Sequence, residues 1–526
     1  MSVGANIIPQ NPRYMRWKAL DSIRTVVPTK TNRPMRTIFD AMRSHAQSAG
    51  DVKSISDQTE TLTRRDLLAR VAALASDLRR LPRVIGLFAP NGVEWVIGQL
   101  ACVLAGKIAV PLPTFFSDNQ LAYIIRNASI ELILVGQATL SRALQSGVDI
   151  HLIDNHRYEW QPADIVDGFG QVIYTSGSTG NPKGVRHESG QIAWSAAALA
   201  AATDAHESDR YLSVLPLPLL LETICAVFVP QLIGAYAYFD SRAAEAVGRS
   251  NPTELAAAFE RHRPTTSVVV PQLLRSWTGE LLATGGRAPA SLRFVAVGGA
   301  PVPAALVTAA WDLGIPVHEG YGLSECCSVV AVNCASERRA GTVGRPLRGL
   351  KVSIEEGEIV VDGPSVMDGY LAQAAARRPW RTGDLGKLDV DGFLIVLGRK
   401  DNLIVTSFGR NISPEWIETM LLGDPRIAFC AVIGNGESYL TAILIPSAHG
   451  SAWFASASEK NVHDMIAECC ANAPDYAVPS AFILVSLDQA RDAQILTSNF
   501  RFVRKTLASF VTNRSLHMTD RSKNVS

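Results

Sequence analysis

Cysteine pairs of the kind that bind zinc are missing from this sequence of 526 residues, because no Cys-x-x-Cys motif occurs in it. The eight cysteines are Cys102, Cys225, Cys326, Cys327, Cys334, Cys430, Cys469 and Cys470. Their scattered spacing argues against a zinc site and against a disulfide framework. Thiols without such a framework suit a reducing compartment, so we expect a cytoplasmic protein.

The chain also lacks an excess of charge of either sign. It has 50 Lys and Arg against 49 Asp and Glu, which gives a formal net charge of +1. Because nucleic-acid-binding proteins usually carry a basic patch or excess, we expect no nucleic acid partner. Residues 1–16 lack the apolar core of a signal peptide, and we expect no secretory leader.

Long uninterrupted apolar runs are absent as well. The most apolar stretch, residues 214–238, contains three prolines together with Glu222 and Gln231. Such residues are costly inside a bilayer, so the stretch is interpreted as a buried helix of a globular core.

What the sequence does contain is the composition of a large globular protein. A chain of this length is too long for one hydrophobic core, so two or more domains are expected. Between residues 84 and 319, strand-like apolar segments alternate with helix-like ones. This alternation predicts an α/β fold with largely parallel sheets, whose ligands bind at the carboxyl ends of the strands.

The pattern changes after about residue 341. Short strands with tight turns, including the hairpin signal Asp391-Gly392, predict a small β-rich subdomain that ends near Gly398. The charged segment 399–402 is interpreted as a linker. The predicted organisation is a large N-terminal domain at 1–398, a linker at 399–402 and a small, mobile α+β C-terminal domain at 403–526.

The most informative segment is the glycine- and hydroxyl-rich run 175–183, which follows an apolar strand-like segment. Its hydroxyl donors are Thr175, Ser176, Ser178 and Thr179, and its glycines are Gly177 and Gly180, followed by Gly184. Glycines let the backbone approach phosphate oxygens, and Lys183 adds a positive charge, so the run suits a polyphosphate. The order differs from a P-loop, in which Gly-Lys-Ser/Thr opens a helix. A plain Ser/Gly turn between two strands is the alternative.

Two further motifs follow predicted strands downstream. The segment 298–301, Gly-Gly-Ala-Pro, offers exposed main chain against which a flat adenine can lie. In the segment 319–326, Glu-Gly-Tyr-Gly-Leu-Ser-Glu-Cys, Tyr321 can stack on a base and Ser324 can contact phosphate. Glu325 can hold magnesium, because Mg²⁺ prefers oxygen ligands. A surface carboxylate is the alternative for Glu325.

A third motif, 380–386, places Asp384 in Trp-Arg-Thr-Gly-Asp-Leu-Gly, where it can accept hydrogen bonds from ribose hydroxyls. Arg399 can reach the same ribose or a phosphate. The alternatives are a turn cap for Asp384 and a solvated linker charge for Arg399. The adjacent thiols of Cys326 and Cys327 are interpreted as small packing residues under the nucleotide.

The order of these motifs resembles that of the adenylate-forming superfamily, which includes acyl-CoA synthetases, peptide-synthetase adenylation domains and luciferases. The resemblance covers about residues 39–507. Within it, segment 406–417, Thr-Ser-Phe-Gly-Arg-Asn-Ile-Ser-Pro-Glu-Trp-Ile, is most similar to long-chain fatty acid–CoA ligases. The resemblance implies an AMP-forming acid–thiol ligase of fatty acid metabolism that activates an apolar, medium- or long-chain, carboxylic acid. Aryl and short branched acids stay open as substrates.

The resemblance implies a nucleotide site built from the matched positions. The implied nucleotide-binding residues are Thr175, Ser176, Gly177, Ser178, Thr179, Gly180, Lys183, Gly299, Ala300, Pro301, Glu319, Gly320, Tyr321, Gly322, Ser324, Asp384 and Arg399. The implied catalytic residues are Lys183, Glu325 and Arg501, with Glu325 also the metal ligand. The implied cofactors are ATP, Mg²⁺ and coenzyme A.

The C-terminal part matches with one departure. Asp401 falls at the position of the family's hinge, and Gly409 in the loop that lines a pantetheine tunnel. Where the family usually has a catalytic lysine, spacing from residues 496–497 places Arg501. Arginine keeps the charge but changes its geometry. Three alternatives stay open: Arg501 takes over the role of the catalytic lysine, Lys505 takes it over in a shifted register, or adenylation is impaired.

Three alternatives for function follow. The acceptor is coenzyme A, or else an acyl carrier protein. The chain is an enzyme, or else a catalytically impaired adenylate-family binding protein. The third alternative is an enzyme that forms the acyl-adenylate but does not transfer the acyl group to a thiol. A monomer or homodimer is expected. Peripheral contact with a membrane is possible only because an apolar substrate would favour it.

Overall fold

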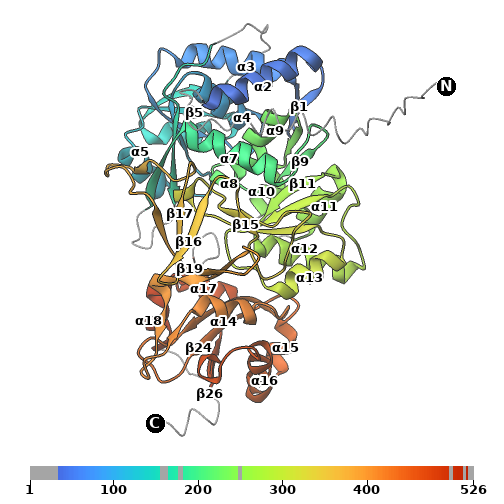
Figure 1. The fold of residues 1–526 in the computed structure, drawn as a ribbon, viewed down its shortest axis with the longest axis vertical. Helices are drawn as coiled ribbons and strands as arrows, with labels where there is room; N and C mark the ends of the chain where they lie inside the picture. Colours follow the sequence, from blue (N-terminus) through green and yellow to red (C-terminus); the bar gives the residue numbers. More distant parts are fainter. Residues whose placement is uncertain are drawn as a thin grey trace, which may run out of the picture.

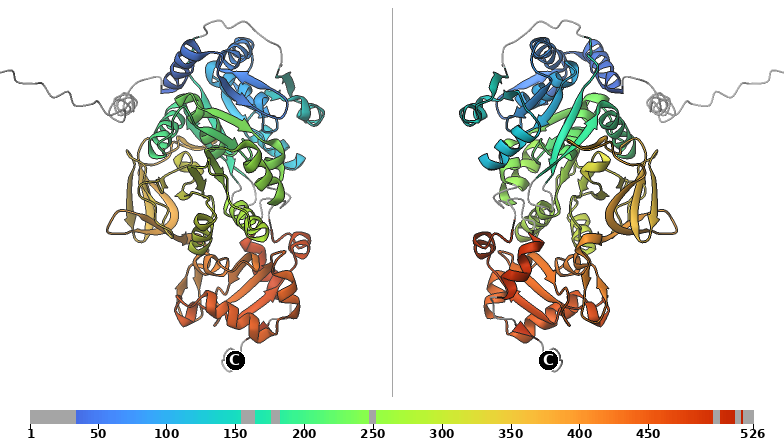
Figure 2. Two further views of the ribbon diagram at one scale, coloured as in Figure 1. Left: turned by 90° about the vertical axis from the view of Figure 1, so that its right-hand side faces the viewer. Right: turned by 90° about the vertical axis from the view of Figure 1, so that its left-hand side faces the viewer.

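The structure is a computed structural model that describes residues 34–153, 164–175, 182–246, 252–496, 502–512 and 517–518. The molecule is elongated (Figures 1 and 2). Helices α2 (Pro34–Ala49) and α3 (Arg64–Leu78) lie at one end of the long axis, and the C-terminal elements, coloured orange to red, lie at the other.

Within the described residues, the largest sheet has nine strands in the order β15-β14-β13-β12-β11-β9-β10-β1-β2. They are β1 (Lys53–Ser56), β2 (Thr61–Thr63), β9 (Arg210–Ser213), β10 (Tyr236–Phe239), β11 (Thr266–Val269), β12 (Phe294–Val297), β13 (Val317–Tyr321), β14 (Ala331–Val332) and β15 (Arg345–Pro346). From β1 to β13 the neighbouring strands pair in parallel. The carboxyl ends of β9, β11, β12 and β13 therefore meet at one edge.

A second large sheet has seven described strands in the order β18-β8-β7-β4-β3-β5-β6. They are β3 (Val84–Phe88), β4 (Ile108–Pro111), β5 (Leu132–Val135), β6 (Asp149–Leu152), β7 (Gly170–Thr175), β8 (Lys183–Glu188) and β18 (Gly369–Tyr370). On β5, Leu132 and Leu134 join one hydrophobic cluster, and Ile133 and Val135 join another. Both faces of the sheet are therefore covered at β5, which explains why the central strands β3, β4 and β5 contain only apolar residues and glycine. The two sheets confirm the predicted α/β class.

Helices cover the sheets and bury the main core. They are α4 (Val93–Leu104), α5 (Asp118–Asn127), α6 (Leu140–Ala143), α7 (Ser189–Ala202), α8 (Leu220–Glu222), the π-helical turn η3 (Thr223–Phe228), α9 (Val229–Ile233), α10 (Ser241–Ala246), α11 (Pro252–His262), α12 (Pro271–Thr284) and α13 (Ala304–Asp312). The apolar stretch 214–238 forms α8, η3, α9 and β10, so its interpretation as buried helix holds for its middle part. Among the described residues, no helix is both long and apolar enough to cross a membrane.

The predicted β-rich part is a separate four-stranded antiparallel sheet in the order β16-β17-β19-β20. Its strands are β16 (Lys351–Glu355), β17 (Glu358–Asp362), β19 (Trp380–Leu388) and β20 (Leu394–Arg399). Asp391 and Gly392 lie in the connection between β19 and β20, and Gly392 has a φ of +80° that favours glycine. The register places Asp384 directly opposite Arg399.

After β20 the chain continues through the short 3₁₀ turn η5 (Lys400–Asn402) into an α+β arrangement. Its elements are β21 (Ile404–Val405), β22 (Asn411–Ile412), α14 (Pro414–Leu421), β23 (Ile427–Ile433), β24 (Thr441–Pro446), α15 (Ser451–Ser456), α16 (Glu459–Cys469), β25 (Ala481–Leu484), α17 (Leu487–Asp492), α18 (Arg504–Thr512) and β26 (His517–Met518). Strands β23 to β26 form one sheet with hydrophobic clusters of its own. The smaller C-terminal α+β part is therefore confirmed, whereas the boundaries of the predicted domains stay a prediction.

Candidate active site

A cavity of about 2590 Å³ lies where the strand ends of the large sheet, the small sheet and the C-terminal part meet. Its walls include residues that follow β12 and β13, residues of β19 and β20, and residues of α14 and α18. Open α/β sheets bind ligands at the carboxyl ends of their strands. The cavity is therefore the place at which the predicted motifs should converge.

Asp384 is the centre of one cluster in this cavity. Its side chain is buried, with 7% of the residue's surface exposed, and it accepts a hydrogen bond from the Tyr321 hydroxyl at 2.5 Å. The Arg399 guanidinium donates a second hydrogen bond at 3.0 Å. Burial raises the pKa of Asp384, although the hydrogen bonds from Tyr321 and Arg399 act in the opposite direction. The structure thus brings together three of the predicted nucleotide-binding residues, from β13, β19 and β20.

Glu325 and Lys183 form a second cluster, on two sides of Tyr370. Glu325 lies in the 3₁₀ turn η4 (Ser324–Cys326), and its carboxylate accepts a hydrogen bond from the Tyr370 hydroxyl at 2.7 Å. The Lys183 ammonium lies 5.7 Å from the centre of the Tyr370 ring. Tyr370 is absent from the residues predicted from the sequence. It stands on the two-residue strand β18, which has no periodic pattern that would reveal it.

The segment 298–302 approaches the end of β13 closely. A Cβ atom on Gly298 would lie 2.8 Å from the Gly320 carbonyl oxygen, so only glycine permits this approach. Next to it, Gly299 has a φ of +84°, and Ala300 and Pro301 also line the cavity. The segment therefore presents main chain to the cavity, as predicted for an adenine platform.

Glu319 is half-buried beside that platform and lines the same cavity. Burial raises the pKa of Glu319 to about 8, and a backbone hydrogen bond from Val302 opposes the shift. Within the described part of the chain, its Oε2 atom has no hydrogen-bond partner. A protonated carboxyl group is able both to donate and to accept hydrogen bonds, which suits the edge of a purine base.

The phosphate loop is described only at its two ends. Thr175 ends β7, Lys183 begins β8, and the two residues are opposite each other in an antiparallel pair. Both line the cavity. The positions Ser176, Gly177, Ser178, Thr179 and Gly180 lie outside the described residues, and so does Arg501.

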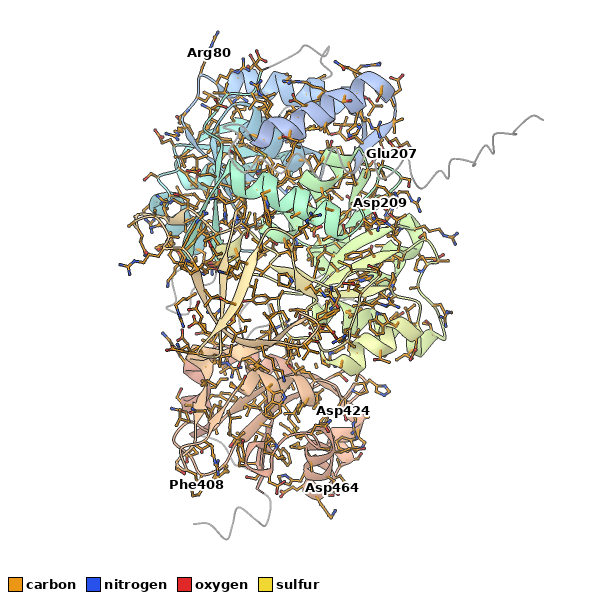
Figure 3. The ribbon with its side chains drawn as sticks, viewed as in Figure 1. Arg80, Glu207, Asp209, Phe408, Asp424 and Asp464 are labelled. Atoms are coloured by element: carbon orange, nitrogen blue, oxygen red, sulfur yellow. The ribbon has the colours of Figure 1, made fainter. Side chains whose placement is uncertain are left out.

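The predicted C-terminal residues are not all brought to the cavity. Asp401, in η5, and Lys505, on α18, line it. Gly409 does not: it lies in the turn between β21 and β22 with a φ of +70°. Its neighbour Phe408, labelled in Figure 3, is exposed near the end of the molecule that holds the C-terminal elements. In this arrangement the predicted pantetheine loop is therefore distant from the nucleotide cluster.

Three residues near the site are buried in ways that fit packing. Burial lowers the pKa of His187 to about 4, so the imidazole is neutral. Burial raises the pKa of the Cys327 thiol to about 12 and the pKa of the Cys326 thiol still further. Neither thiol is ionised near neutral pH, which supports a packing role over a nucleophilic one.

The cavity continues along the parallel strands, away from the nucleotide cluster. Its walls there are mostly apolar, formed by Leu221, Cys225, Val229, Val268, Phe294 and Ala296. At the start of β9 and β12 it ends near Asp209, labelled in Figure 3, and Arg293. Arg293 donates to Asp209 through Nε at 2.6 Å and through a second, shorter bond, and Asp209 also accepts from the Thr265 hydroxyl at 2.9 Å.

Comparison with known proteins identifies the class. The family model "AMP-binding enzyme" matches residues 42–371, and "AMP-binding enzyme C-terminal domain" matches residues 401–509. The chain belongs to the AMP-binding enzyme family, and it is an AMP-forming acid–CoA ligase.

Relatives and solved structures are consistent with this family. The chain is 30% identical over 424 residues to 2-succinylbenzoate–CoA ligase of Bacillus licheniformis, which covers 76% of this chain and 85% of that protein. It is similar to the structure of O-succinylbenzoate coenzyme A synthetase from Bacillus subtilis in complex with ATP and magnesium ion, with a TM-score of 0.73, 25% identity and coverage of 89% and 99%. An anthranilate CoA ligase in complex with anthranoyl-AMP shares the fold, with a TM-score of 0.77, 19% identity and coverage of 92% and 98%. These relatives are named for aromatic acids, and they do not support the expected similarity to long-chain fatty acid–CoA ligases.

Proposed function

We propose that this enzyme activates an apolar carboxylic acid with ATP and then transfers the acyl group to the thiol of coenzyme A. In the first step a carboxylate oxygen of the acid attacks the α-phosphorus of ATP, which forms an acyl-adenylate and releases pyrophosphate. In the second step the thiol displaces AMP. The observation that carries the proposal is the convergence of Asp384, Lys183 and Glu325 on one cavity that continues into an apolar pocket.

The nucleotide is expected to lie across the two clusters. Asp384 accepts hydrogen bonds from the ribose hydroxyls, and Arg399 orients its carboxylate and favours the ionised form. The base lies against segment 298–301, with Glu319 at its edge. The phosphates lie towards Lys183 and Ser324, where the positive charge of Lys183 stabilises negative charge that develops during the attack.

The residues present fit magnesium as a partner of the phosphates. Glu325 supplies a carboxylate at the cavity wall, and Mg²⁺ is usually held by one or two carboxylates together with substrate phosphates. Among the described residues, no group of three or more acidic, cysteine or histidine side chains could hold a metal alone. Bound magnesium would neutralise charge on the phosphate oxygens.

The two steps need different arrangements of the C-terminal part. Here Lys505 lines the cavity and Gly409 lies far from it, which is the arrangement expected for adenylation. For thiol transfer, rotation at Asp401 would bring the loop of Gly409 to the acyl group. Closure in each state excludes water, which protects the acyl-adenylate from hydrolysis.

The apolar pocket favours an acid without a second charge. Among the described residues that line its deep part, the cationic side chain is Arg293, and it is already paired with the buried Asp209. A second carboxylate, such as that of 2-succinylbenzoate, would have to compete with Asp209 for Arg293 there. Arg275, on α12, lines the same cavity on the side that faces Asp424 of the C-terminal part. We therefore propose an apolar monocarboxylic acid, either a medium- or long-chain fatty acid or an aryl acid. The dicarboxylic acid 2-succinylbenzoate is the second candidate, because relatives are named for it.

The strand length limits the size of the acid. The cavity runs beside β9, β11 and β12, each of four residues, and a strand rises about 3.3 Å per residue, so the pocket is roughly 13 Å deep. This depth suits a medium chain or an aryl group better than a very long chain. Ala296, in the wall on β12, is small enough to leave the passage open.

A thioester-formation screen tests the proposal. Purified enzyme would be offered graded fatty acids, benzoate-type acids and 2-succinylbenzoate, with coenzyme A and acyl carrier protein side by side. We expect an apolar monocarboxylic acid and coenzyme A to give the highest kcat/KM. Ala296→Phe should remove activity with the longer acids and keep it with the shortest active acid, which is the internal control. Preference for 2-succinylbenzoate would overturn the substrate proposal, and bound ATP without any product would indicate an impaired binding protein.

A further inference from the structure

Tyr370 connects the two sides of the phosphate region. Its hydroxyl donates to the Glu325 carboxylate at 2.7 Å, and the Lys183 ammonium lies 5.7 Å from the centre of its ring. Within the described part of the chain, this hydroxyl is the hydrogen-bond donor to the Glu325 side chain. An ammonium within about 6 Å of an aromatic centre is attracted by the negative face of the ring.

The backbone around Tyr370 is fixed on both sides. Strand β18 pairs with β8, so that Tyr370 lies opposite Val185, two residues after Lys183. The amide of Leu371 donates to the Gly184 carbonyl at 2.7 Å. On the other side, the amide of Met367 donates to the Glu325 carbonyl at 2.8 Å.

Further contacts hold the ring and the strand in place. The Trp380 ring meets the Tyr370 ring edge to face, with centres 6.2 Å apart. Arg186 and Asp368 form an ion pair at 2.9 Å between β8 and the residue before β18. The ring therefore has little freedom to move, and its hydroxyl fixes one oxygen of the Glu325 carboxylate.

We infer that Tyr370 is a positioning residue, which orients the Glu325 carboxylate for the metal of the nucleotide complex and holds Lys183 beside the phosphates. This inference rests on the proposed metal role of Glu325. A carboxylate whose second oxygen is held by a hydroxyl presents the first in one direction, which favours the near-ideal octahedral geometry that Mg²⁺ demands. The ring serves as a neutral partner for Lys183, so that its charge stays available to phosphate.

The experiment measures nucleotide binding without catalysis. The dissociation constant of ATP is measured by calorimetry over a range of Mg²⁺ concentrations and in the presence of a chelator, with no acid present. For Tyr370→Phe, which keeps the ring and removes the hydroxyl, we expect the Mg²⁺ concentration for half-maximal stimulation of binding to rise about tenfold, the effect of losing one hydrogen bond to a charged group. Metal-free binding should stay within about twofold of wild type, because the ring that faces Lys183 remains.

Two further variants make the outcome decisive. Tyr236→Phe is the matched control, since it removes a hydroxyl that interacts with Ser56 in the nine-stranded sheet, to which β18 does not belong. It should leave the Mg²⁺ dependence unchanged. In the Glu325→Gln background, the Tyr370→Phe change should add nothing, because its effect acts through that carboxylate.

The failures are distinguishable. If Glu325→Gln leaves the Mg²⁺ dependence of ATP binding unchanged, the proposed metal role fails. If Glu325→Gln weakens it and Tyr370→Phe does not, the role of Tyr370 is overturned. The same holds if Tyr370→Phe has its full effect in the Glu325→Gln background. Thermal unfolding of each variant shows whether a loss of Mg²⁺ dependence comes from unfolding. If Tyr370→Phe is unfolded, Tyr370→His, which keeps a ring with a hydrogen-bond donor, should restore the Mg²⁺ dependence in part. A folded Tyr370→His variant that restores none of it overturns the role of Tyr370.

Discussion

Replacing Asp384 with asparagine should remove the ability of the enzyme to distinguish ATP from 2′,3′-dideoxy-ATP. The carboxylate is buried, receives the Tyr321 hydroxyl at 2.5 Å and is paired with Arg399 at 3.0 Å. These two contacts leave each carboxylate oxygen able to accept a further hydrogen bond, and Asp384 lines the cavity. If the further hydrogen bonds come from the ribose hydroxyls, the charge of Asp384 matters only for nucleotides that carry them.

The size of the effect follows from the bonds involved. A hydrogen bond to a charged group contributes about 1.5–3 kcal/mol, and about 1.4 kcal/mol corresponds to a tenfold change in affinity. Asparagine keeps the shape and one acceptor oxygen but loses the charge. We therefore expect the KM for ATP in acid-dependent pyrophosphate exchange to rise about 10- to 100-fold, with little change for the dideoxy nucleotide.

The control is a second arginine-paired aspartate on the same hairpin. Asp389, in the connection from β19 to β20, pairs with Arg339 at 2.5 Å and does not line the cavity. Asp389→Asn should leave both nucleotides unaffected. If Asp384→Asn discriminates between ATP and the dideoxy nucleotide as wild type does, Asp384 does not bind the ribose.

Three other predictions address charge and movement. Burial raises the pKa of Glu319 from 4.5 to about 8, so between these pH values the native state holds a proton that the unfolded chain releases, and the free energy of unfolding should fall as pH rises. Urea unfolding of Glu319→Gln should lack this dependence on pH. An equal dependence in wild type and variant would contradict the raised pKa. Arg501→Ala should reduce adenylation but leave thiol transfer from supplied acyl-adenylate largely intact. If the register is shifted, Lys505→Ala should have this effect instead. Single-turnover assays of each step distinguish the two, and equal loss in both steps would mean that neither residue serves adenylation alone. Asp401→Pro should slow thiol transfer more than adenylation because it stiffens the hinge, and a parallel decline of the two rates would argue against rotation there.

The fold was predictable where local pattern and tertiary environment agree. Strand β5 is apolar at each position because both of its faces are buried, and the segment around it alternates with amphipathic helices. The π-helical turn Thr223–Phe228 was not predictable in detail, since an apolar run indicates burial but not the hydrogen-bond spacing within it.

The candidate site was predictable where residues follow strands directly. Segments 298–301 and 319–325 come at the ends of β12 and β13, and parallel strands bring such ends together. Tyr370 was not predictable, because its partner Glu325 is 45 residues away and its strand is only two residues long. The substrate was not predictable either, because the pocket is made by side chains from α7, η3, β9, β11 and β12, whose packing no single motif records.

Acid-dependent exchange of radioactive pyrophosphate into ATP by the purified protein tests the central claim most directly. It reports reversible formation of an acyl-adenylate and needs neither coenzyme A nor rotation of the C-terminal part. We expect exchange that requires both Mg²⁺ and an apolar carboxylic acid and whose KM for ATP rises in Asp384→Asn. Absence of exchange with every acid offered, from a protein that also fails to bind ATP, would contradict the account.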